Sequence, residues 1–411
     1  MSKDNKRQNS MKTRLENIKN IINTTNLSGA NPLHGLNENM DTINYYCGIS
    51  EGDDDTRNSK TVLGKKKLNF NKVMSKLDAK LVYLKGGANG IVFYCFCKSM
   101  NKELSVKVVP YLNRREYGNE TNIQRPENSE ILMLKTLSYF IIKSKTPHLI
   151  LPILTFDTDI KTFLKLKDAN IIPKNDKSYD RFLENYKNGV YKNTVSVVIS
   201  EWANKGDLGT FLKNNYTKLK LIEWKCIFFQ LISVLAIIQT KFPNFRHNDL
   251  KANNVLVSSY DLEYPSQYSI NNKFYILPSI GYRIFLWDFD FACINGVVEN
   301  IKVYEKWTND VNINNKQNKY YDIHYFFCTL CNGFIPNLLQ KNEVYPEVKD
   351  FINYVVPNEL MTIPKENKDK KTFDENNYKV NPKCRLLADI ELHTPVELLE
   401  HSFFDCFKCK K

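Results

Sequence analysis

The spacing of apolar residues from about position 79 onwards predicts a β-sheet. Short β-branched and aromatic runs recur between turn residues, at 81–84, 91–96, 104–109, 149–156 and 195–200. Runs of this length and composition are typical of strands. Residues 157–193 break the pattern with Lys, Asp and Asn and few apolar anchors, so we interpret them as an insertion. The sequence therefore predicts a strand-rich region over about 79–200.

After about residue 204 the pattern changes to helices. Apolar residues fill 208–212 and the long run 221–240. The most apolar part of that run, 226–238, is too short to span a bilayer and predicts a buried helix. A second irregular insertion over about 258–281 precedes one more strand at 282–287. Strands followed mainly by helices predict the α+β fold class.

Residues 1–78 form an N-terminal extension of different composition, rich in Asn, Ser, Lys and Asp. Such a composition buries little surface, so we expect the extension to be largely disordered. One part differs, because Met11, Leu15, Ile18 and Ile22 fall on one face of a helix with basic residues around them. A transient or packed helix is the favoured interpretation. The alternative is a helix that docks on a partner protein or an anionic membrane.

A short polar loop lies between the apolar runs 226–238 and 255–257 and contains Asp249, Lys251 and Asn254. In phosphoryl transfer an aspartate accepts the proton of the attacking hydroxyl, a lysine holds the transferred phosphate, and an asparagine coordinates a metal ion. An ordinary polar loop with an asparagine turn would also fit these residues. The parts of the chain before and after the loop therefore decide the interpretation.

A glycine turn and a lysine supply the first of these parts. Gly86, Gly87 and Gly90 separate two strand-like runs, where backbone amides could approach phosphates, although a plain hairpin turn fits equally well. Lys107 lies within an apolar strand-like run, and burying a lysine without an anionic partner is costly. ATP phosphates and one glutamate would provide that partner.

The expected glutamate is Glu130, which borders the apolar stripe of the helical run 129–137. Glu127 is a rival, and Glu120 is a more distant one. A capping or surface glutamate is the structural alternative.

The linker after strand 195–200 could pair the backbone groups of Glu201 and Ala203 with an adenine edge, or it could be a plain connection. Asp288 ends the apolar run 282–287, which suits a magnesium ligand. Asp322 lies in an apolar helical run, and we expect its carboxylate to accept backbone amides of the polar loop. Residues 290–320 between them are polar, and we expect a mobile segment that faces the substrate.

Charge and cysteine content change this picture little. The net charge of +13 implies attraction to anions but does not choose among nucleotide, acidic protein, nucleic acid and membrane. No base-reading or stacking motif is evident, so no specific nucleic acid is predicted. Ten cysteines without a signal-like N-terminus indicate a reducing, cytoplasmic compartment. The two C-x-x-C pairs, Cys328/Cys331 and Cys406/Cys409, are interpreted as ordinary cysteines rather than zinc ligands.

Together these parts resemble the eukaryotic-type protein kinase family over about 79–407. More narrowly, they resemble serine/threonine kinases of large DNA viruses, above all the late, virion-associated type of poxviruses. This narrower resemblance rests on four features. They are the glycine loop that runs into residues 90–93, the insertion before 282–287, the sequence Asp-Phe-Asp-Phe at 288–291, and the pair Tyr320 and Tyr321 before Asp322.

The resemblance implies a bilobal fold. A small antiparallel β lobe with one key helix would span about 79–200, and a larger, mainly helical lobe about 204–411. It implies transfer of the γ-phosphoryl group of ATP to protein Ser or Thr, with Mg²⁺ or alternatively Mn²⁺. It also implies a late viral protein that is active in host cytoplasm, packaged in virions and needed for their assembly. The basic N-terminal extension adds an anionic membrane or viral structural proteins as candidate partners.

The resemblance also assigns roles to residues. Catalysis falls to Asp249 and Lys251, metal binding to Asn254 and Asp288, and structural support to His247 and Asp322. The ATP-binding residues implied are Gly86, Gly87, Gly90, Val92, Lys107, Glu130, Glu201 and Ala203.

Three positions depart from the family pattern. Lys85 replaces the first loop glycine, Asn248 replaces the arginine before the catalytic aspartate, and Asp290 replaces the glycine after the metal aspartate. The change at Asn248 puts control by a phosphorylated activation loop in doubt, because that arginine normally pairs with the phosphate. Two rival functions stay open: a catalytically inactive scaffold, and a small-molecule kinase of the choline or aminoglycoside type.

Overall fold

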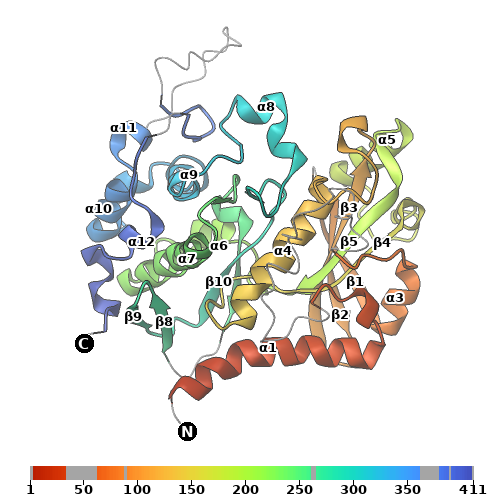
Figure 1. The fold of residues 1–411 in the computed structure, drawn as a ribbon, viewed down its shortest axis with the longest axis horizontal. Coiled ribbons are helices and arrows are strands. Elements are labelled where there is room, and N and C mark those ends of the chain that lie inside the picture. Colours follow the sequence, from red (N-terminus) through yellow and green to blue (C-terminus); the bar gives the residue numbers. More distant parts are fainter. Residues whose placement is uncertain are drawn as a thin grey trace. The chain divides into compact units, whose positions relative to one another are not determined.

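The computed structural model describes residues 3–33, 63–87, 90–260, 265–361, 379–387 and 390–409. The chain divides into two compact units (Figure 1). The first unit combines Met1–Lys143 with Ile150–Trp202, and the second combines Ser144–Leu149 with Ala203–Lys411.

The first unit is built on a five-stranded antiparallel sheet (Figure 1). Its spatial order is β1-β2-β3-β5-β4. The strands are β1 (Ala79–Gly87), β2 (Gly90–Cys97), β3 (Lys102–Leu112), β4 (Pro152–Asp159) and β5 (Tyr191–Glu201). Alternate residues of β2 are buried, as expected for a strand with one face on the core. The predicted antiparallel sheet is therefore confirmed.

In the described residues of this unit, four helices accompany the sheet: α1 (Lys3–Thr25), α3 (Phe70–Lys76), α4 (Pro126–Ile142) and α5 (Lys177–Lys187). Helix α4 begins with Pro126, whose fixed φ suits the first helical position. It contacts β3, β4 and β5, and nearly all of its residues are buried. Helix α1 in turn contacts α4.

Helix α1 covers the part of residues 1–78 for which the sequence favoured a transient or packed helix. The apolar side chains of Met11, Ile18 and Ile22 are buried, as is that of Ile21, which the sequence analysis did not single out. The predicted apolar helical face therefore packs against protein, which leaves these side chains covered rather than presented to a membrane. Composition averaged over the extension indicated disorder, whereas the 3.6-residue periodicity of Met11, Ile18 and Ile22 indicated this helix. Residues 34–62 of the extension lie outside the described residues.

The described part of the second unit is mainly helical, with three two-stranded antiparallel sheets. The helices are α6 (Leu208–Asn215), α7 (Leu221–Lys241), α8 (Lys306–Asn309), α9 (Tyr321–Thr329), α10 (Pro346–Val355), α11 (Asn358–Met361) and α12 (Pro395–Leu398). The sheets pair β6 (Phe245–Arg246) with β11 (Cys293–Ile294), β7 (Val255–Ser259) with β10 (Tyr282–Leu286), and β8 (Ser266–Ile270) with β9 (Lys273–Leu277). The predicted α+β class is confirmed.

Helix α7 is the core of the second unit. It covers the predicted run 221–240 and one further residue, and by length and composition alone it could cross a membrane. However, 78% of its most apolar window is buried inside the unit. The Phe228 ring lies edge-on to Phe327 at 4.9 Å, and Phe351 stacks on Phe403 at 4.4 Å. The prediction of a buried helix is confirmed, because its apolar surface is covered by aromatic side chains.

Candidate functional site

In the first unit, Lys107 and Glu130 form a buried ion pair. The Lys107 Nζ lies 2.6 Å from the Glu130 Oε1, and the two side chains are 9% and 5% exposed. Lys107 lies directly opposite Val92 on β2 and Val198 on β5, so these three side chains share one face of the sheet. Helix α4 brings Glu130 to this face, where a charge pair stabilises a lysine that would otherwise be costly to bury.

The two rival glutamates have other partners. Glu127 accepts a hydrogen bond from the Leu112 amide at 2.9 Å and pairs with Arg125 at 3.1 Å. The backbone carbonyl of Glu120 accepts a hydrogen bond from the Asn128 side chain at 2.9 Å. The structure therefore brings Glu130, and not Glu127, to Lys107.

The glycines of the β1–β2 turn allow close approach of the backbone. Gly90 has a φ of 142°, and a Cβ there would lie 2.1 Å from the Val108 carbonyl oxygen. A Cβ on Gly86 would lie 2.7 Å from the Ser178 Cβ. Gly87 pairs with Gly90 across the turn, while residues 88 and 89 lie outside the described part of the chain. Only glycine fits at Gly90, because both its φ and its contact exclude a side chain.

The insertion at 157–193 supports this turn, a role that the sequence did not indicate. Asp176 caps helix α5 by accepting the Tyr179 amide at 2.8 Å, and it also accepts the Tyr83 hydroxyl at 2.8 Å. Burial and this hydrogen bond raise the pKa of the Tyr83 phenol. The start of α5 thus fastens to β1 beside Gly86, where the glycine leaves room for Ser178.

Glu201, at the end of β5, is fixed at its backbone and its side chain. Its amide donates to the Leu151 carbonyl at 3.2 Å, and its carboxylate accepts the Leu151 amide at 2.8 Å. Arg14 of helix α1 binds both carboxylate oxygens, at 2.8 Å and 2.5 Å. Nothing in the local sequence predicted Arg14, because the two residues are 187 positions apart. Ala203, in the second unit, is buried, and its carbonyl accepts the Gly206 amide at 3.4 Å.

In the second unit, Asp249 is surrounded by hydrogen-bond donors. Its Oδ2 lies 2.9 Å from the Lys251 Nζ and 3.0 Å from the Asn254 Nδ2, which also donates to the Asp249 carbonyl at 2.8 Å. These contacts use the side-chain nitrogen of Asn254, so its side-chain oxygen is the atom suited to a metal ion. The structure therefore brings the predicted aspartate, lysine and asparagine together at one carboxylate.

The other oxygen of Asp249 has two donors that the sequence analysis missed. Arg385 donates from its NH2 group to Oδ1 at 2.7 Å, and the Tyr325 hydroxyl lies 3.3 Å from the same oxygen. Arg385 is the only arginine after position 283 in a chain that otherwise uses many lysines there. Its apolar neighbours, Cys384 and Leu386, were the signal that it would be buried.

Asp322 holds the backbone of the loop that carries Asp249. Its buried carboxylate accepts the amides of His247 at 2.7 Å and Asn248 at 2.9 Å. Burial raises the pKa of Asp322, and the hydrogen bonds and positive neighbours oppose that shift. The His247 ring donates from Nε2 to the Trp287 carbonyl at 3.0 Å, which ties the loop to the end of β10.

Asn254 and Asp288 lie at the same end of the β7–β10 pair. Val255 is opposite Leu286, and the Trp287 amide donates to the Asn254 carbonyl at 3.1 Å. Asp288 has a φ of 61°, a left-handed conformation that Asp adopts more readily than most residues. One amide oxygen and one carboxylate are the hard oxygen donors that Mg²⁺ prefers, so this donor set fits the metal that the family implies.

The cysteine pairs do not form a metal cluster in the described residues. Cys328 and Cys331 are buried, whereas Cys406 and Cys409 are exposed. Among the residues that the structure describes, no group of three or more His, Cys, Asp and Glu side chains could hold a metal ion.

The departures at Asn248 and Asp290 make specific contacts. Asn248 has a φ of 62°, and its side-chain amide donates to the Phe291 and Asn314 carbonyls at 3.1 Å and 3.0 Å. Asp290 forms an ion pair with Lys302. A neutral amide thus contacts the segment after Asp288 where an arginine and a phosphate are usual in the family.

Arg246 adds to these contacts by donating to the Asn314 side-chain oxygen and the Asn312 carbonyl, both at 2.6 Å. The segment also has a small core of its own, formed by Cys293, Val303 and Ile313. Residues 290–320, which were expected to be mobile, therefore form a folded segment. Its few apolar residues were too widely spaced to show a pattern.

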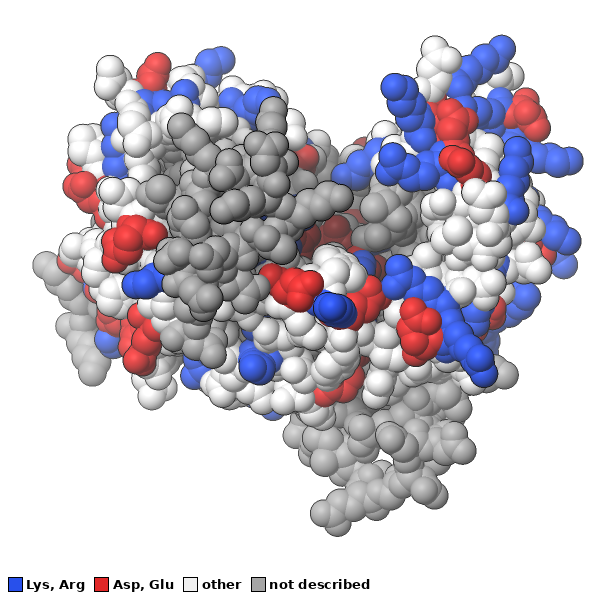
Figure 2. Space-filling model, turned by 90° about the horizontal axis from the view of Figure 1, so that it is seen from above, with Lys and Arg blue, Asp and Glu red and all other residues white. Residues whose placement is uncertain are grey.

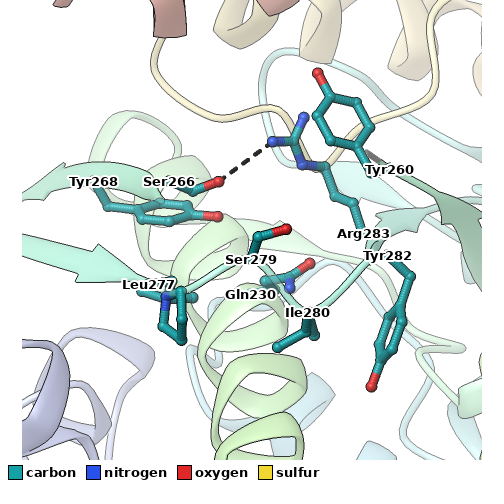
Figure 3. Close-up of a pocket in the computed structure, with 10 residues that line it drawn as sticks. Gln230, Tyr260, Ser266, Tyr268, Leu277, Ser279, Ile280, Tyr282 and Arg283 are labelled. Atoms are coloured by element: carbon teal, nitrogen blue, oxygen red, sulfur yellow. Dashed lines mark hydrogen bonds between the residues drawn. The ribbon is translucent and has the colours of Figure 1, made fainter. Parts of the chain in front are cut away.

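A separate small pocket lies beside the second insertion, which forms the β8–β9 hairpin (Figure 3). The Arg283 guanidinium lies over the Tyr260 ring at 3.8 Å and donates to the Ser266 hydroxyl at 3.5 Å. None of the predicted site residues lines this pocket.

Comparison with known proteins agrees with the resemblance seen in the sequence. Residues 183–387 match the family model described as poxvirus serine/threonine protein kinase. A putative serine/threonine-protein kinase of Acanthamoeba polyphaga mimivirus is 40% identical over 360 residues, which cover 84% of this chain and 74% of that protein. A second putative serine/threonine-protein kinase of the same virus is 23% identical over 79% of this chain and 87% of its own length. Serine/threonine-protein kinase 2 of fowlpox virus is 31% identical over 130 residues, 31% of this chain and 25% of that protein.

Proposed function

Since this chain belongs to the poxvirus-type family of viral serine/threonine protein kinases, we propose that the residues described above carry out its phosphoryl transfer. The observation that carries the proposal is the convergence of Lys251 and Asn254 on one oxygen of Asp249. Asp322 supports it by holding the backbone of the same loop through two amides. Such an arrangement presents one carboxylate in a fixed orientation, as the acceptor of a hydroxyl proton requires.

In this mechanism Asp249 orients the serine or threonine hydroxyl and accepts its proton as the oxygen attacks the γ-phosphorus of ATP. The bond between the γ-phosphorus and the β–γ bridging oxygen breaks, and ADP leaves with that oxygen. Lys251 lies close enough to Asp249 to neutralise charge on the transferred group. The lysine two residues after the aspartate favours a protein substrate over a small molecule.

Asn254 and Asp288 would hold Mg²⁺, with Mn²⁺ as the alternative. The ion would neutralise the charge of the ATP phosphates. The left-handed backbone at Asp288 directs its carboxylate from the end of β10, and Trp287 ties that end to Asn254. Both ligands therefore depend on the β7–β10 pairing.

In the first unit, Lys107 would grip the α- and β-phosphates while Glu130 fixes its ammonium group. Gly86, Gly87 and Gly90 would let backbone amides approach the phosphates, and Val92 would face the nucleotide from the same side of the sheet as Lys107. The backbone groups of Glu201 and Ala203 would bind the adenine edge.

We further propose that the protein is made late in infection, acts in host cytoplasm and enters virions, where it phosphorylates structural proteins. The three relatives described above are viral, which supports this proposal. On the face drawn in Figure 2, Lys and Arg side chains lie among Asp and Glu side chains. Mass spectrometry of purified virions tests the proposal, and absence of the protein from them contradicts it.

The test of the enzymatic proposal is incorporation of label from [γ-³²P]ATP and Mg²⁺ into a generic basic protein. The wild-type chain is compared with Asp288→Ala, and with Asp350→Ala as a control on the exposed side of α10. We expect label on serine or threonine with the wild type and the control, and none with Asp288→Ala. No label with the wild type, but retained ATP binding, would favour the inactive scaffold. Transfer to small molecules alone would favour the small-molecule kinase.

A further inference from the structure

Arg385 projects from a turn that is built to hold it. In the described segment 379–387, Val380 and Leu386 form a backbone bridge. The Asn381 side-chain oxygen accepts the amides of Lys383 and Arg385, both at 2.9 Å. Outside the turn, the Asn312 side chain donates to the Leu386 carbonyl at 2.7 Å. These contacts fix the backbone on both sides of Arg385.

The guanidinium of Arg385 binds two parts of the Asp249 loop. One arm donates to the Asp249 Oδ1 at 2.7 Å, and the other donates to the Asn248 carbonyl at 2.5 Å and the Tyr321 hydroxyl at 3.1 Å. The group lies over the Tyr325 ring at 4.2 Å, and the side chain is only 8% exposed. A planar, forked cation that is held at both arms has one orientation, which a lysine could not reproduce.

The hydrogen-bond donors around Asp249 form two groups, one at each carboxylate oxygen. Arg385 and the Tyr325 hydroxyl lie at Oδ1, whereas Lys251 and Asn254 lie at Oδ2. Since Lys251 and Asn254 are the residues proposed to act in transfer and metal binding, Oδ2 faces the reacting groups. The contacts at Oδ1 come from outside the 247–254 loop and fix the rotation of the carboxylate.

We propose that Arg385 is a positioning residue for phosphoryl transfer, which holds the Asp249 carboxylate so that Oδ2 meets the substrate hydroxyl. This inference rests on the proposed function, in which Asp249 accepts the hydroxyl proton. The turn at 379–387 would thus have a role in the reaction, although its Arg385 lies 136 residues after Asp249 in the chain.

The test compares kcat and KM of the full-length wild type with those of Arg385→Gln and Arg385→Lys. Lys383→Gln is the matched control, because Lys383 is exposed in the same turn. We expect Arg385→Gln to lower kcat by about 10- to 100-fold, because a misplaced catalytic group loses that order of rate. The KM values for ATP and protein should change less than about threefold, since Arg385 would act through Asp249 rather than bind either substrate.

The split between kcat and KM separates positioning from general structural support, since a poorly folded variant would also lose binding of ATP and protein. Arg385→Lys keeps the positive charge but not the planar fork, so we expect it to lower kcat with little change in KM.

A folded Arg385→Gln variant with wild-type kcat would overturn the positioning role alone. A kcat above that of the wild type would also overturn it, because the arginine would then block the hydroxyl site. If Arg385→Gln does not fold, Arg385→Lys decides: a wild-type kcat in that variant overturns the proposal. A wild type that transfers no phosphate overturns the proposed function and this inference together.

Discussion

Two ion pairs, one in each unit, rest on different kinds of structure. Lys107 and Glu130 join a strand and a helix, whose hydrophobic patterns place both residues. Arg385 and Asp249 join two irregular segments, which are held by the side chains of Asn381 and Asp322. The first pair depends on a regular framework and the second on individual hydrogen bonds. Loss of one partner should therefore lower the stability of the first unit and, in the second unit, the rate of phosphoryl transfer.

The largest expected effect is at Asp249. Replacing it by Asn removes the proton acceptor and puts an NH₂ group on one side of the carboxylate site. We expect phosphoryl transfer to fall by about 10²- to 10⁴-fold, the range typical of a general base. Steady-state assays should show this loss while circular dichroism shows an unchanged fold. Asp350→Asn, on an exposed position of α10, is the control, and less than a tenfold loss in Asp249→Asn would contradict the assignment.

The second effect concerns stability in the first unit. Glu130→Leu leaves Lys107 buried without this carboxylate, which should lower the free energy of unfolding by about 3–5 kcal/mol. Adding Lys107→Met should restore much of the loss, because the buried charge is then gone. Urea denaturation measures both variants.

An exposed pair gives the matched control for that experiment. Asp405 is 62% exposed and pairs with Lys408 at 2.6 Å, so Asp405→Asn should cost less than about 1 kcal/mol. A double variant that is no more stable than Glu130→Leu would show that the charge pair is not what the framework depends on.

The third effect is an acid sensitivity of the second unit. Burial lowers the pKa of His324 to about 4, while its Nε2 donates to the Leu360 carbonyl at 3.0 Å. The unfolded chain takes up this proton near pH 6.5, well before the folded protein does. Stability from this group is therefore present above pH 6.5 and lost between about pH 6.5 and 4, by about 3 kcal/mol.

Urea midpoints measured from pH 7.5 to 4 test this expectation. His324→Gln keeps a donor for the Leu360 carbonyl but does not titrate, so its stability should fall less steeply in the same range. Equal slopes in the wild type and His324→Gln would contradict it. His393, which is partly exposed, provides the control through His393→Gln.

The smallest effect is at the N-terminal helix. Arg14→Gln should lower the free energy of unfolding by about 1–2 kcal/mol, since it removes a two-armed contact with the partly exposed Glu201. Hydrogen exchange should increase within residues 11–25. Lys12→Gln, at an exposed position of the same helix, should change neither quantity. Unchanged exchange in Arg14→Gln would show that the apolar face alone holds α1.

The sequence predicted well the placement of residues that lie only a few positions apart in the chain. Alternation in β3 places Val106 and Val108 in the core, and the spacing within 247–254 places Asp249 beside Lys251 and Asn254. Both patterns extend over only a few residues, where strand and loop geometry relates position to direction.

Contacts between distant segments could not be predicted in this way. Arg385 meets Asp249 across 136 residues, and Arg14 meets Glu201 across 187. Each contact depends on turns and caps whose geometry is set by single side chains, such as Asn381, and no periodic pattern records them. The glycine turn lies between these two cases. Its sequence indicated that the backbone could be approached closely, but not that Asp176 would accept the Tyr83 hydroxyl.

The contact between Arg14 and Glu201 also has a consequence for synthesis. Ribosomes add about 5–20 residues per second, so about 10–40 s pass after Arg14 is made before Glu201 exists. Helix α4, which α1 contacts, is complete once residue 142 has been made, well before Glu201 exists. A nascent chain shorter than about 200 residues can therefore contain both helices, but it still lacks the ion pair that ties α1 to the end of β5.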